Sequence, residues 1–208
     1  MTIASPYFIK KANGTLRPVQ DYCKLNDFTI KNRYLLPLIK ELINKLRGAQ
    51  YFTKLDIRWG YNNIRIKEGE KWKATFRTNK GLFEPTVMFF GLCNSPSTFQ
   101  RMMNEILRDL INEGHIVVYL DDILVFTKDL QEHCQSAHQM LTRLQEHHLY
   151  LKGTKCFFKE REISYLRLIV GSGIIKMDPK KIKAVKEWAI PKTKRELQAF
   201  IRFFNYYR

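Results

Sequence analysis

Two adjacent carboxylates, Asp121 and Asp122, interrupt an apolar run in the segment VVYLDDILVF, residues 117–126. The residues on both sides are apolar or aromatic, which favours two buried strands that meet at the acids. An Asp-Asp turn lacks the glycine that tight hairpins prefer, so the turn alone does not explain the two acids. Like charges this close disfavour each other's ionisation unless a cation neutralises them. The pair therefore indicates a bound cation, although an Asp-Asp turn taken alone is more often structural.

Asp56 repeats this pattern at the end of the alternating segment YFTKLDI, residues 51–57. Three carboxylates without a cluster of His or Cys suit a hard ion with oxygen ligands, such as Mg²⁺. The four cysteines show no C-x-x-C spacing, which favours reduced thiols over a disulfide framework or a zinc site. Cys134 and His138 share a helical face, but two ligands are too few for a structural zinc site.

The charge of the chain points to a polyanionic partner. Its 208 residues include 36 Lys and Arg against 20 Asp and Glu, a formal net charge of +16. With 45% hydrophobic residues the chain can bury a core, which excludes a disordered class. No run approaches the roughly 18 apolar residues of a membrane span, and the start lacks the order of a signal peptide. Nucleic acid is the expected partner, and the chain is expected to be intracellular with no membrane association.

Hydrophobic periodicity predicts a mixture of strands and helices. The predicted strands are the two arms of a hairpin about Asn13-Gly14, then YFTKLDI, KWKATFRT, IVVYL, ILVF, KCFF and ISYLRLIV, with a turn at Gly171-Ser172-Gly173. The predicted helices are residues 37–47, a segment from an N-cap at Ser95 to Gly114, about 130–148, a helix after Asp178-Pro179, and a last one opened by a capping box of Thr193 and Glu196. The helix at 130–148 is expected to bury Leu130, Ala137, Leu141 and Leu144.

The segment YLDDIL resembles the Y-x-D-D motif of reverse transcriptases. The segments RPVQDYCKLN, LDIRWGY, FFGLCNSPSTFQ and KCFFKEREISYL resemble other motifs of that family, and they occur in the same order. The likeness covers essentially the whole chain. The blocks NRYLLPLIKELINKL and MDPKKIKAVKEW resemble in particular the polymerase of gypsy-type LTR retrotransposons in a fungal-like form.

This resemblance implies an α+β right-hand polymerase fold, in which an antiparallel palm sheet packs on helices. The implied division is fingers at 1–31 and 64–94, palm at 32–63 and 95–172, and the start of a thumb at 173–208. The implied activity is that of an RNA-directed DNA polymerase, a nucleotidyltransferase that adds deoxynucleotides to a primer 3′-hydroxyl.

The resemblance also assigns roles to particular residues. Asp56, Asp121 and Asp122 match the catalytic, metal-binding carboxylates, which would hold two Mg²⁺ ions, with Mn²⁺ as a substitute, for two-metal phosphoryl transfer. Asp56 and Asp121 are expected to bridge the metals, and Asp122 to be the looser ligand. The expected nucleotide-site residues are Lys10 and Arg17 for the triphosphate, Tyr61 as a gate against the 2′-hydroxyl, Phe90 and Gly91 in the nucleotide pocket, and Tyr119 at the primer terminus. The plainer alternatives are exposed hairpin charges at positions 10 and 17 and a core tyrosine at position 61.

Four positions depart from the family pattern. Cys23 stands where arginine is expected, Leu36 where proline is, and Arg167 and Arg202 where glycine is. Each change is reachable by one C-to-T or G-to-A substitution in a codon, which leads to the hypothesis of a decaying element copy. Arg167 matters most, because the expected glycine lies in the hairpin that resembles the primer grip.

The expected partners are an RNA or DNA template with its primer, and deoxynucleoside triphosphates. The RNase H and integrase regions of a parent polyprotein are expected but absent here, and the chain is expected to be a partial copy. The expected location is a cytoplasmic retrotransposon particle with access to the nucleus. A remnant that only binds nucleic acid remains the alternative. An RNA-templated RNA polymerase is disfavoured because Leu120 and Tyr61 replace the residues typical of that class.

Overall fold

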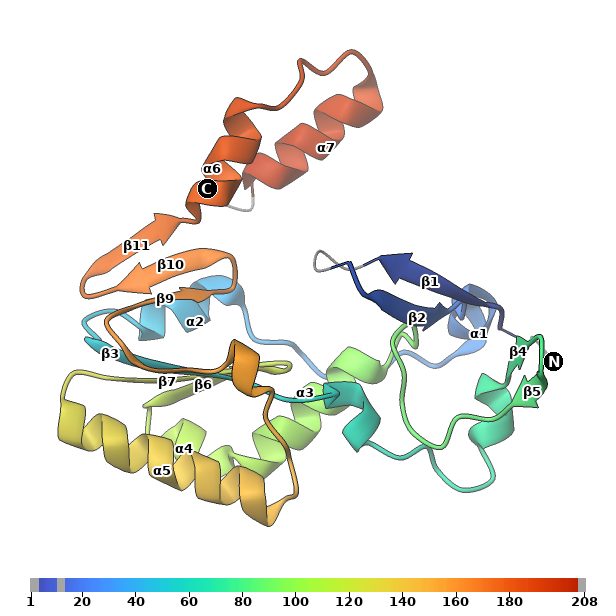
Figure 1. Ribbon diagram of the computed structural model, residues 1–208, viewed down its shortest axis with the longest axis horizontal. Coiled ribbons are helices and arrows are strands. Elements are labelled where there is room, and N and C mark those ends of the chain that lie inside the picture. The colour runs from blue at the N-terminus through green and yellow to red at the C-terminus, as the bar shows by residue number, and fades with distance from the viewer. Residues whose placement is uncertain (1–3, 11–13, 206–208) are drawn as a thin grey trace.

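A four-stranded antiparallel sheet in the order β6-β7-β3-β8 lies at the centre of this computed structural model, which describes residues 4–10 and 14–205 (Figure 1). Its strands are β3 (Tyr51–Asp56), β6 (Ile116–Tyr119), β7 (Asp122–Thr127) and β8 (Phe157–Glu160). These strands fall on four of the predicted segments. The pairing of β3 with β7 sets Asp56 directly opposite Asp122, so residues far apart in sequence meet at one end of the sheet.

Helices cover both faces of this sheet (Figure 1). They are α2 (Ile39–Lys45), α3 (Ser95–Ile106), α4 (Arg108–Asn112) and α5 (Leu130–Glu146). The helices α3, α4 and α5 bury Phe99 and Met103, Leu110, and Met140, respectively, against Leu55 and Ile123 of the sheet. On the other face, α2 packs against the neighbouring strand positions, including Phe52 and Leu124. This alternation along each strand is the period of two from which the strands were predicted.

A second antiparallel sheet, in the order β11-β10-β9, joins α2 on that second face through Ile163 and Val170. Its strands are β9 (Glu162–Tyr165), β10 (Leu168–Gly171) and β11 (Ile174–Met177). The prediction of one strand over ISYLRLIV was wrong, because the chain reverses at Leu166 and Arg167. Both residues have positive φ, 47° and 66°, in a turn without glycine. The turn predicted at residues 171–173 is confirmed between β10 and β11.

The predicted N-terminal hairpin is confirmed as β1 (Pro6–Lys10) paired with β2 (Leu16–Gln20), although Asn13 of its turn lies outside the described residues. The neighbouring elements are α1 (Cys23–Phe28), the 3₁₀ turns η1 (Gly60–Asn63) and η2 (Lys71–Ala74), and the strands β4 (Phe76–Thr78) and β5 (Gly81–Phe83). The predicted strand KWKATFRT was wrong in its first half, which forms η2. Local backbone hydrogen bonds close this 3₁₀ turn in spite of the alternating pattern that predicted a strand. The turn also has a tertiary contact, because the hydroxyl of buried Tyr22 donates to the Ala74 carbonyl at 2.9 Å.

Two helix predictions need correction. The helix expected from Ser95 to Gly114 is divided at Leu107 into α3 and α4, and its N-cap residue is Asn94. The Ser95 hydroxyl instead donates to the Phe89 carbonyl at 3.0 Å.

The helix predicted at about 130–148 is confirmed as α5, but of the four residues predicted to be buried only Leu144 is fully buried. Its buried residues are His133, Ser136, Met140 and Leu144, whereas Leu130 and Leu141 are exposed and Ala137 is half-buried. The face turned to the sheet includes a histidine and a serine, so hydrophobicity alone did not identify it.

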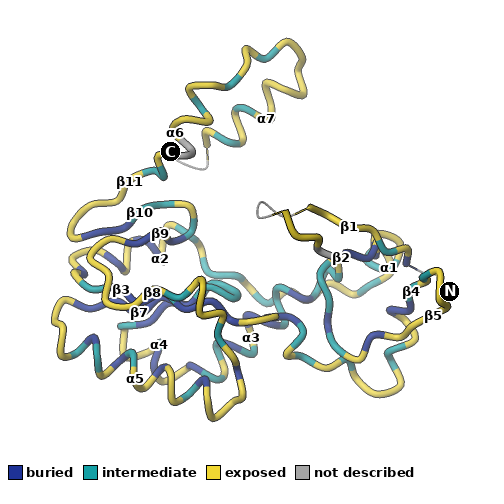
Figure 2. Tube along the Cα trace, viewed as in Figure 1, coloured by how far each residue is buried: buried dark blue, intermediate teal, exposed yellow. Residues whose placement is uncertain are grey.

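The C-terminal helices α6 (Pro179–Lys186) and α7 (Lys194–Asn205) lie beyond β11, away from the central sheet (Figure 1). The predicted capping box is confirmed, because Glu196 N donates to Thr193 Oγ1 at 3.2 Å and Thr193 N donates to Glu196 Oε2 at 3.3 Å. Most of this unit is exposed, whereas the buried positions concentrate in and around the sheet (Figure 2). Within the described ranges, no helix combines the length and apolar character needed to span a membrane.

Candidate active site

The turn between β6 and β7 carries the acidic pair in an arrangement that differs from the prediction. Its two connecting residues are Leu120 and Asp121, and Asp122 is already the first residue of β7. Leu120 has a positive φ of 54°. The Asp121 carbonyl accepts a hydrogen bond of 3.1 Å from Ile57 N, directly after Asp56. All three predicted catalytic acids therefore lie together at one end of the sheet.

Asp121 has the electrostatics of a crowded acid. Burial of its side chain is the largest cause that raises its pKa, and the charges of Asp122 and Asp56 raise it further. A backbone hydrogen bond and Lys155 act in the opposite direction. Asp56 is also buried, with 8% of its surface exposed. The site thus gathers more negative charge than its surroundings favour, which is the condition for binding a cation.

Two lysines that the sequence interpretation missed lie against these acids. Lys155 Nζ is 2.5 Å from Asp56 Oδ2, and Lys54 Nζ is 3.1 Å from Asp122 Oδ1. Strand alternation alone could have predicted that Lys54 lies near the acids, because it is two residues before Asp56 and so faces the same side of β3. Lys155 enters from η3 (Gly153–Lys155), and no local pattern relates it to the acids.

The donor chemistry of the site fits a divalent metal. Its available ligands are carboxylate oxygens, which suit Mg²⁺ or Mn²⁺ and not a soft metal. Among the residues that the structure describes, no three His, Cys, Asp or Glu side chains converge tightly enough to form a ready-made metal cluster. Asp56 and Asp122 are instead each paired with a lysine, Lys155 and Lys54. A metal would therefore bind through rearrangement of these side chains.

Gln100 is a third residue that the sequence interpretation missed. Its side chain is fully buried on α3, where Oε1 accepts from Leu120 N at 2.8 Å and Nε2 donates to the Val118 carbonyl at 3.2 Å. These two bonds hold the backbone of the turn that carries Asp121. A glutamine on the apolar face next to Phe99 and Met103 was the available signal, since buried amides need partners.

The predicted sugar gate lies beside the acids but is packed into the core. Tyr61 is 8% exposed, and its ring centroid is 4.9 Å from that of Phe90 and 5.7 Å from that of Phe99. Burial, followed by the charge of Asp121, raises the pKa of Tyr61 to about 12. Tyr61 and Phe90 are thus in contact, in a packing that is also that of a core tyrosine, and their roles at a nucleotide site stay predictions.

Gly91 follows Phe90 at a place where only glycine fits. Its φ is +103°, and an added Cβ would lie 3.0 Å from the Gln20 carbonyl oxygen. The Gly91 carbonyl accepts from Asn26 Nδ2 at 2.8 Å. Gly91 therefore joins the segment after β2 to the start of α3.

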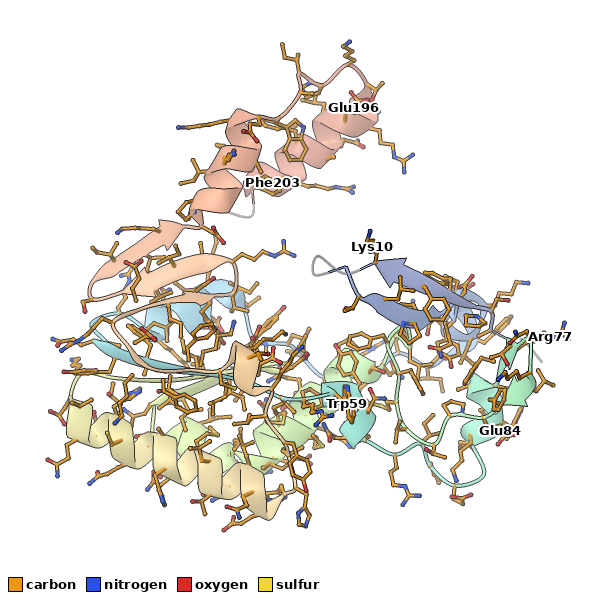
Figure 3. The ribbon with its side chains drawn as sticks, viewed as in Figure 1. Lys10, Trp59, Arg77, Glu84, Glu196 and Phe203 are labelled. Atoms are coloured by element: carbon orange, nitrogen blue, oxygen red, sulfur yellow. The ribbon has the colours of Figure 1, made fainter. Side chains whose placement is uncertain are left out.

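Of the remaining predicted residues, Lys10 lies farther out and Tyr119 lies in a pocket beside Asp122. Lys10 is exposed at the end of β1 and points away from the hairpin, and within the described chain no ion pair joins it to the three acids (Figure 3). The backbone of Arg17 pairs with Ile9 in the same hairpin. Tyr119 lines a pocket of about 340 Å³ together with Lys54, Asp122 and Arg167 among others. The structure thus groups Tyr119 with Asp122 and keeps Lys10 apart from the three acids.

Comparison with known proteins places this site in a family context. The family model described as reverse transcriptase (RNA-dependent DNA polymerase) matches residues 9–170. The chain is 43% identical over 192 residues to the retrovirus-related Pol polyprotein from transposon 297 of Drosophila melanogaster. It is 36% identical over 201 residues to the transposon Tf2-3 polyprotein of Schizosaccharomyces pombe. These alignments cover 92% and 97% of the chain but only 18% and 15% of the relatives. The chain therefore spans less than a fifth of either relative.

Solved structures give the fold. A foamy viral protease-reverse transcriptase in complex with double-stranded DNA matches 99% of the chain and 36% of its own length, with a TM-score of 0.92 at 21% identity. The same kind of viral protein in complex with an RNA/DNA hybrid matches 99% of the chain and 27% of its own length, with a TM-score of 0.87 and 21% identity. The predicted α+β right-hand fold is confirmed by these matches. The predicted residue boundaries of fingers, palm and thumb stay predictions.

Proposed function

Because the chain belongs to the reverse transcriptase (RNA-dependent DNA polymerase) family, we propose that it is the core of an RNA-directed DNA polymerase from a gypsy-type LTR retrotransposon. The observation that carries the proposal is the meeting of Asp56, Asp121 and Asp122 at one end of the central sheet, with Asp121 crowded by the other two charges. Three carboxylates that meet at one end of a sheet, one of which lines a pocket of about 340 Å³, suit phosphoryl transfer better than a purely structural turn.

In this proposal Asp56, Asp121 and Asp122 hold two Mg²⁺ ions. Such ions, when bound, lower the pKa of a primer 3′-hydroxyl and stabilise the charge on a leaving pyrophosphate. The residues of the chain do the rest. Gln100 holds the turn that aims Asp121, and Lys155 and Lys54 balance the charge of the other two acids.

Nucleotide selection is proposed for Tyr61 and Phe90, whose rings pack together next to Asp121. A bulky ring beneath the incoming sugar excludes a 2′-hydroxyl by steric clash. Lys10 and Arg17 are proposed to bind the triphosphate. Since Lys10 is apart from the acids, this role requires the β1–β2 hairpin to approach the sheet when a nucleotide binds.

The proposed partners are a template with its primer and deoxynucleoside triphosphates. Support comes from the similar viral proteins, which were solved with double-stranded DNA and with an RNA/DNA hybrid. Exposed cations on and between α6 and α7 suit sequence-independent contact with phosphates. They include Lys183, Lys186, Lys192, Lys194 and Arg195. A cytoplasmic retrotransposon particle is the location that this function implies.

Primer extension on a poly(rA)–oligo(dT) duplex with Mg²⁺ tests the proposal. The Asp121→Asn variant should lose at least about 100-fold in nucleotide incorporation, because it removes a metal ligand. Its affinity for the duplex at fixed salt should stay within about threefold, since phosphate contacts come from Lys and Arg elsewhere. Asp27→Asn, which removes an exposed acid from α1, is the matched control and should extend primers normally. Extension by Asp121→Asn at the unmodified rate would refute the catalytic assignment, and a chain that binds the duplex without extending it would support a binding remnant.

A further inference from the structure

Gln100 is part of a longer series of hydrogen bonds that runs away from the acids. Besides its bonds to Leu120 and Val118, Gln100 Nε2 donates to Asn104 Oδ1 at 2.9 Å, one helical turn further along α3. Asn104 Nδ2 in turn donates to the Tyr34 hydroxyl at 2.8 Å. The series therefore connects Leu120, Gln100, Asn104 and Tyr34, and it begins at the turn that carries Asp121.

The far end of this series lies on a segment that α3 holds by polar contacts. Asn94 Nδ2 donates to the Ile30 carbonyl at 2.9 Å, and Asn94 Oδ1 accepts from Asn32 N at 2.9 Å. Tyr34 N donates to Asn32 Oδ1 at 3.0 Å. Apolar packing contributes little at Ile30, which is 92% exposed. Side-chain amides thus fix Tyr34 in place against the helix.

The order of donors gives the series a direction. Leu120 N must meet a carbonyl oxygen, so Gln100 has to turn Oε1 towards the turn and Nε2 towards Asn104. Asn104 must then present Oδ1 to Gln100 and Nδ2 to Tyr34. If the Gln100 amide were reversed, two N–H groups would face each other at Leu120, which would cost a buried hydrogen bond. The Leu120 N–H and the Val118 carbonyl thus set the orientation of the Gln100 amide, and the bond to Asn104 restrains the Gln100 side chain in that position.

The turn depends on this support because its own sequence does not favour it. Leu120 adopts a φ of 54°, which ordinary residues seldom adopt, and neither Leu120 nor Asp121 is glycine. A strained turn persists only where its surroundings over-determine it. Among the side chains described, Gln100 supplies the hydrogen bonds to the Leu120 N–H and the Val118 carbonyl.

We propose that Asn104 and Tyr34 are positioning residues, which orient Gln100 and so fix the Leu120-Asp121 turn for catalysis. Neither side chain needs to touch a substrate. The catalytic part of this inference rests on the proposed polymerase function. The geometric part, that the turn loosens when Asn104 or Tyr34 is changed, stands independently of that function.

Two measurements test the proposal on the full chain: the hydrogen-exchange rate of the Leu120 amide by NMR, and kcat and KM for primer extension. Asn104→Ala should accelerate Leu120 exchange about tenfold and lower kcat about tenfold, with KM for the nucleotide within about twofold. The effect stays below about 100-fold because Gln100 keeps its bond to Val118. Tyr34→Phe removes only the hydroxyl and should give about a threefold change in each quantity. The double variant should be no worse than Asn104→Ala, since both changes break one series.

The chain offers a conservative variant and a matched control. Asn104→Asp keeps an acceptor for Gln100 and can accept from the Tyr34 hydroxyl, so it should restore most of kcat. Asn112→Ala removes the same residue type from the wall of the same cavity, of about 430 Å³, that Asn104 and Tyr34 line, and it should behave as the unmodified chain. If Asn104→Ala unfolds, the milder Tyr34→Phe decides the question.

The outcomes separate the inference from the proposed function. Unchanged Leu120 exchange in Asn104→Ala, or equal acceleration in Asn112→Ala, would overturn the inference. Faster exchange with an unchanged kcat in an active chain would reduce the series to a structural role and would also overturn it. An unmodified chain without extension activity would count against the proposed function. In that case hydrogen exchange alone tests whether Asn104 holds the Leu120-Asp121 turn. Faster Leu120 exchange in Asn104→Ala but not in Asn112→Ala would support this role, and any other result would overturn it.

Discussion

Arg167→Gly is the substitution for which the structure gives the sharpest expectation. Leu166 and Arg167 are the two residues between β9 and β10, and both have positive φ, which is the conformation of a type I′ turn. An ordinary residue in this region costs about 1–2 kcal/mol relative to glycine. Glycine also lowers the free energy of unfolding by about 0.4–1 kcal/mol, because it gives the unfolded chain more conformational freedom. The substitution should therefore stabilise the protein by about 0.5–1 kcal/mol, equivalent to a rise in Tm of about 1–4 °C for a chain of this length.

The same substitution should also affect catalysis. Arg167 lines the pocket of about 340 Å³ that Tyr119 and Asp122 share, so its side chain lies close to where the primer is expected to bind. A displacement of about 1 Å at a reacting centre can cost on the order of 100-fold in rate. Removing the bulk of Arg167 should raise primer extension markedly. One cation fewer on a chain of +16 should change duplex affinity by no more than about threefold.

Thermal unfolding and primer extension, measured side by side, check both expectations. Lys176→Gly is the matched control, because it removes another long cation from the same sheet at a position without positive φ. This control should lower the free energy of unfolding by about 0.5–1 kcal/mol. If Arg167→Gly lowers Tm as the control does, the turn is not strained at Arg167. Equal extension rates with and without Arg167 would mean that arginine is accommodated, and the decaying-copy hypothesis would be wrong at this site.

Two further predictions concern Tyr61 and His133. Tyr61→Ala should raise the use of ribonucleotides relative to deoxynucleotides, whereas Tyr61→Phe should not. An unchanged ratio in Tyr61→Ala would make Tyr61 a core residue only. Burial, followed by the charge of Lys159, lowers the pKa of His133, whose Nε2 lies 2.7 Å from Thr53 Oγ1. The unfolded chain therefore takes up a proton at higher pH than the folded one, and stability should fall as pH drops below about 6.5. Thermal melts between about pH 7.5 and pH 5 should show this loss weakened in His133→Gln and unchanged in the exposed control His138→Gln, and an undiminished loss in His133→Gln would refute it.

Local patterns in the sequence predicted those elements whose stabilising contacts are close in sequence. The alternation in YFTKLDI predicted β3, and the capping box at Thr193 predicted the start of α7. The turns at Leu120 and Leu166 could not be predicted in this way, because they lack glycine and depend on contacts from elsewhere in the chain. In the same way, the contact of Lys155 with Asp56 depends on how η3 packs beside β3 and on no sequence spacing.

The resemblance to a known family supplied what local patterns could not. The pairing that brings Asp56 opposite Asp122 is set by strand order, and strand order is not written in either segment. Gln100 is the last residue of the motif FFGLCNSPSTFQ, but its contact with the Leu120 amide depends on the packing of α3 against the β6–β7 turn. Tyr61 shows the opposite case, since its packing against Phe90 and Phe99 agrees both with a gate and with a core residue.

The lysines beside the acids have a consequence for how the acidic end of the sheet is stabilised. With Lys155 on Asp56 and Lys54 on Asp122, two of the three negative charges already have a counter-ion supplied by the chain itself. The chain itself thus neutralises part of its acidic end, whereas in small metal-dependent domains the metal provides the folding free energy. Under the proposed function, Asp56 and Asp122 would take up a divalent ion by releasing Lys155 and Lys54, whose ammonium groups would then be free to bind phosphates.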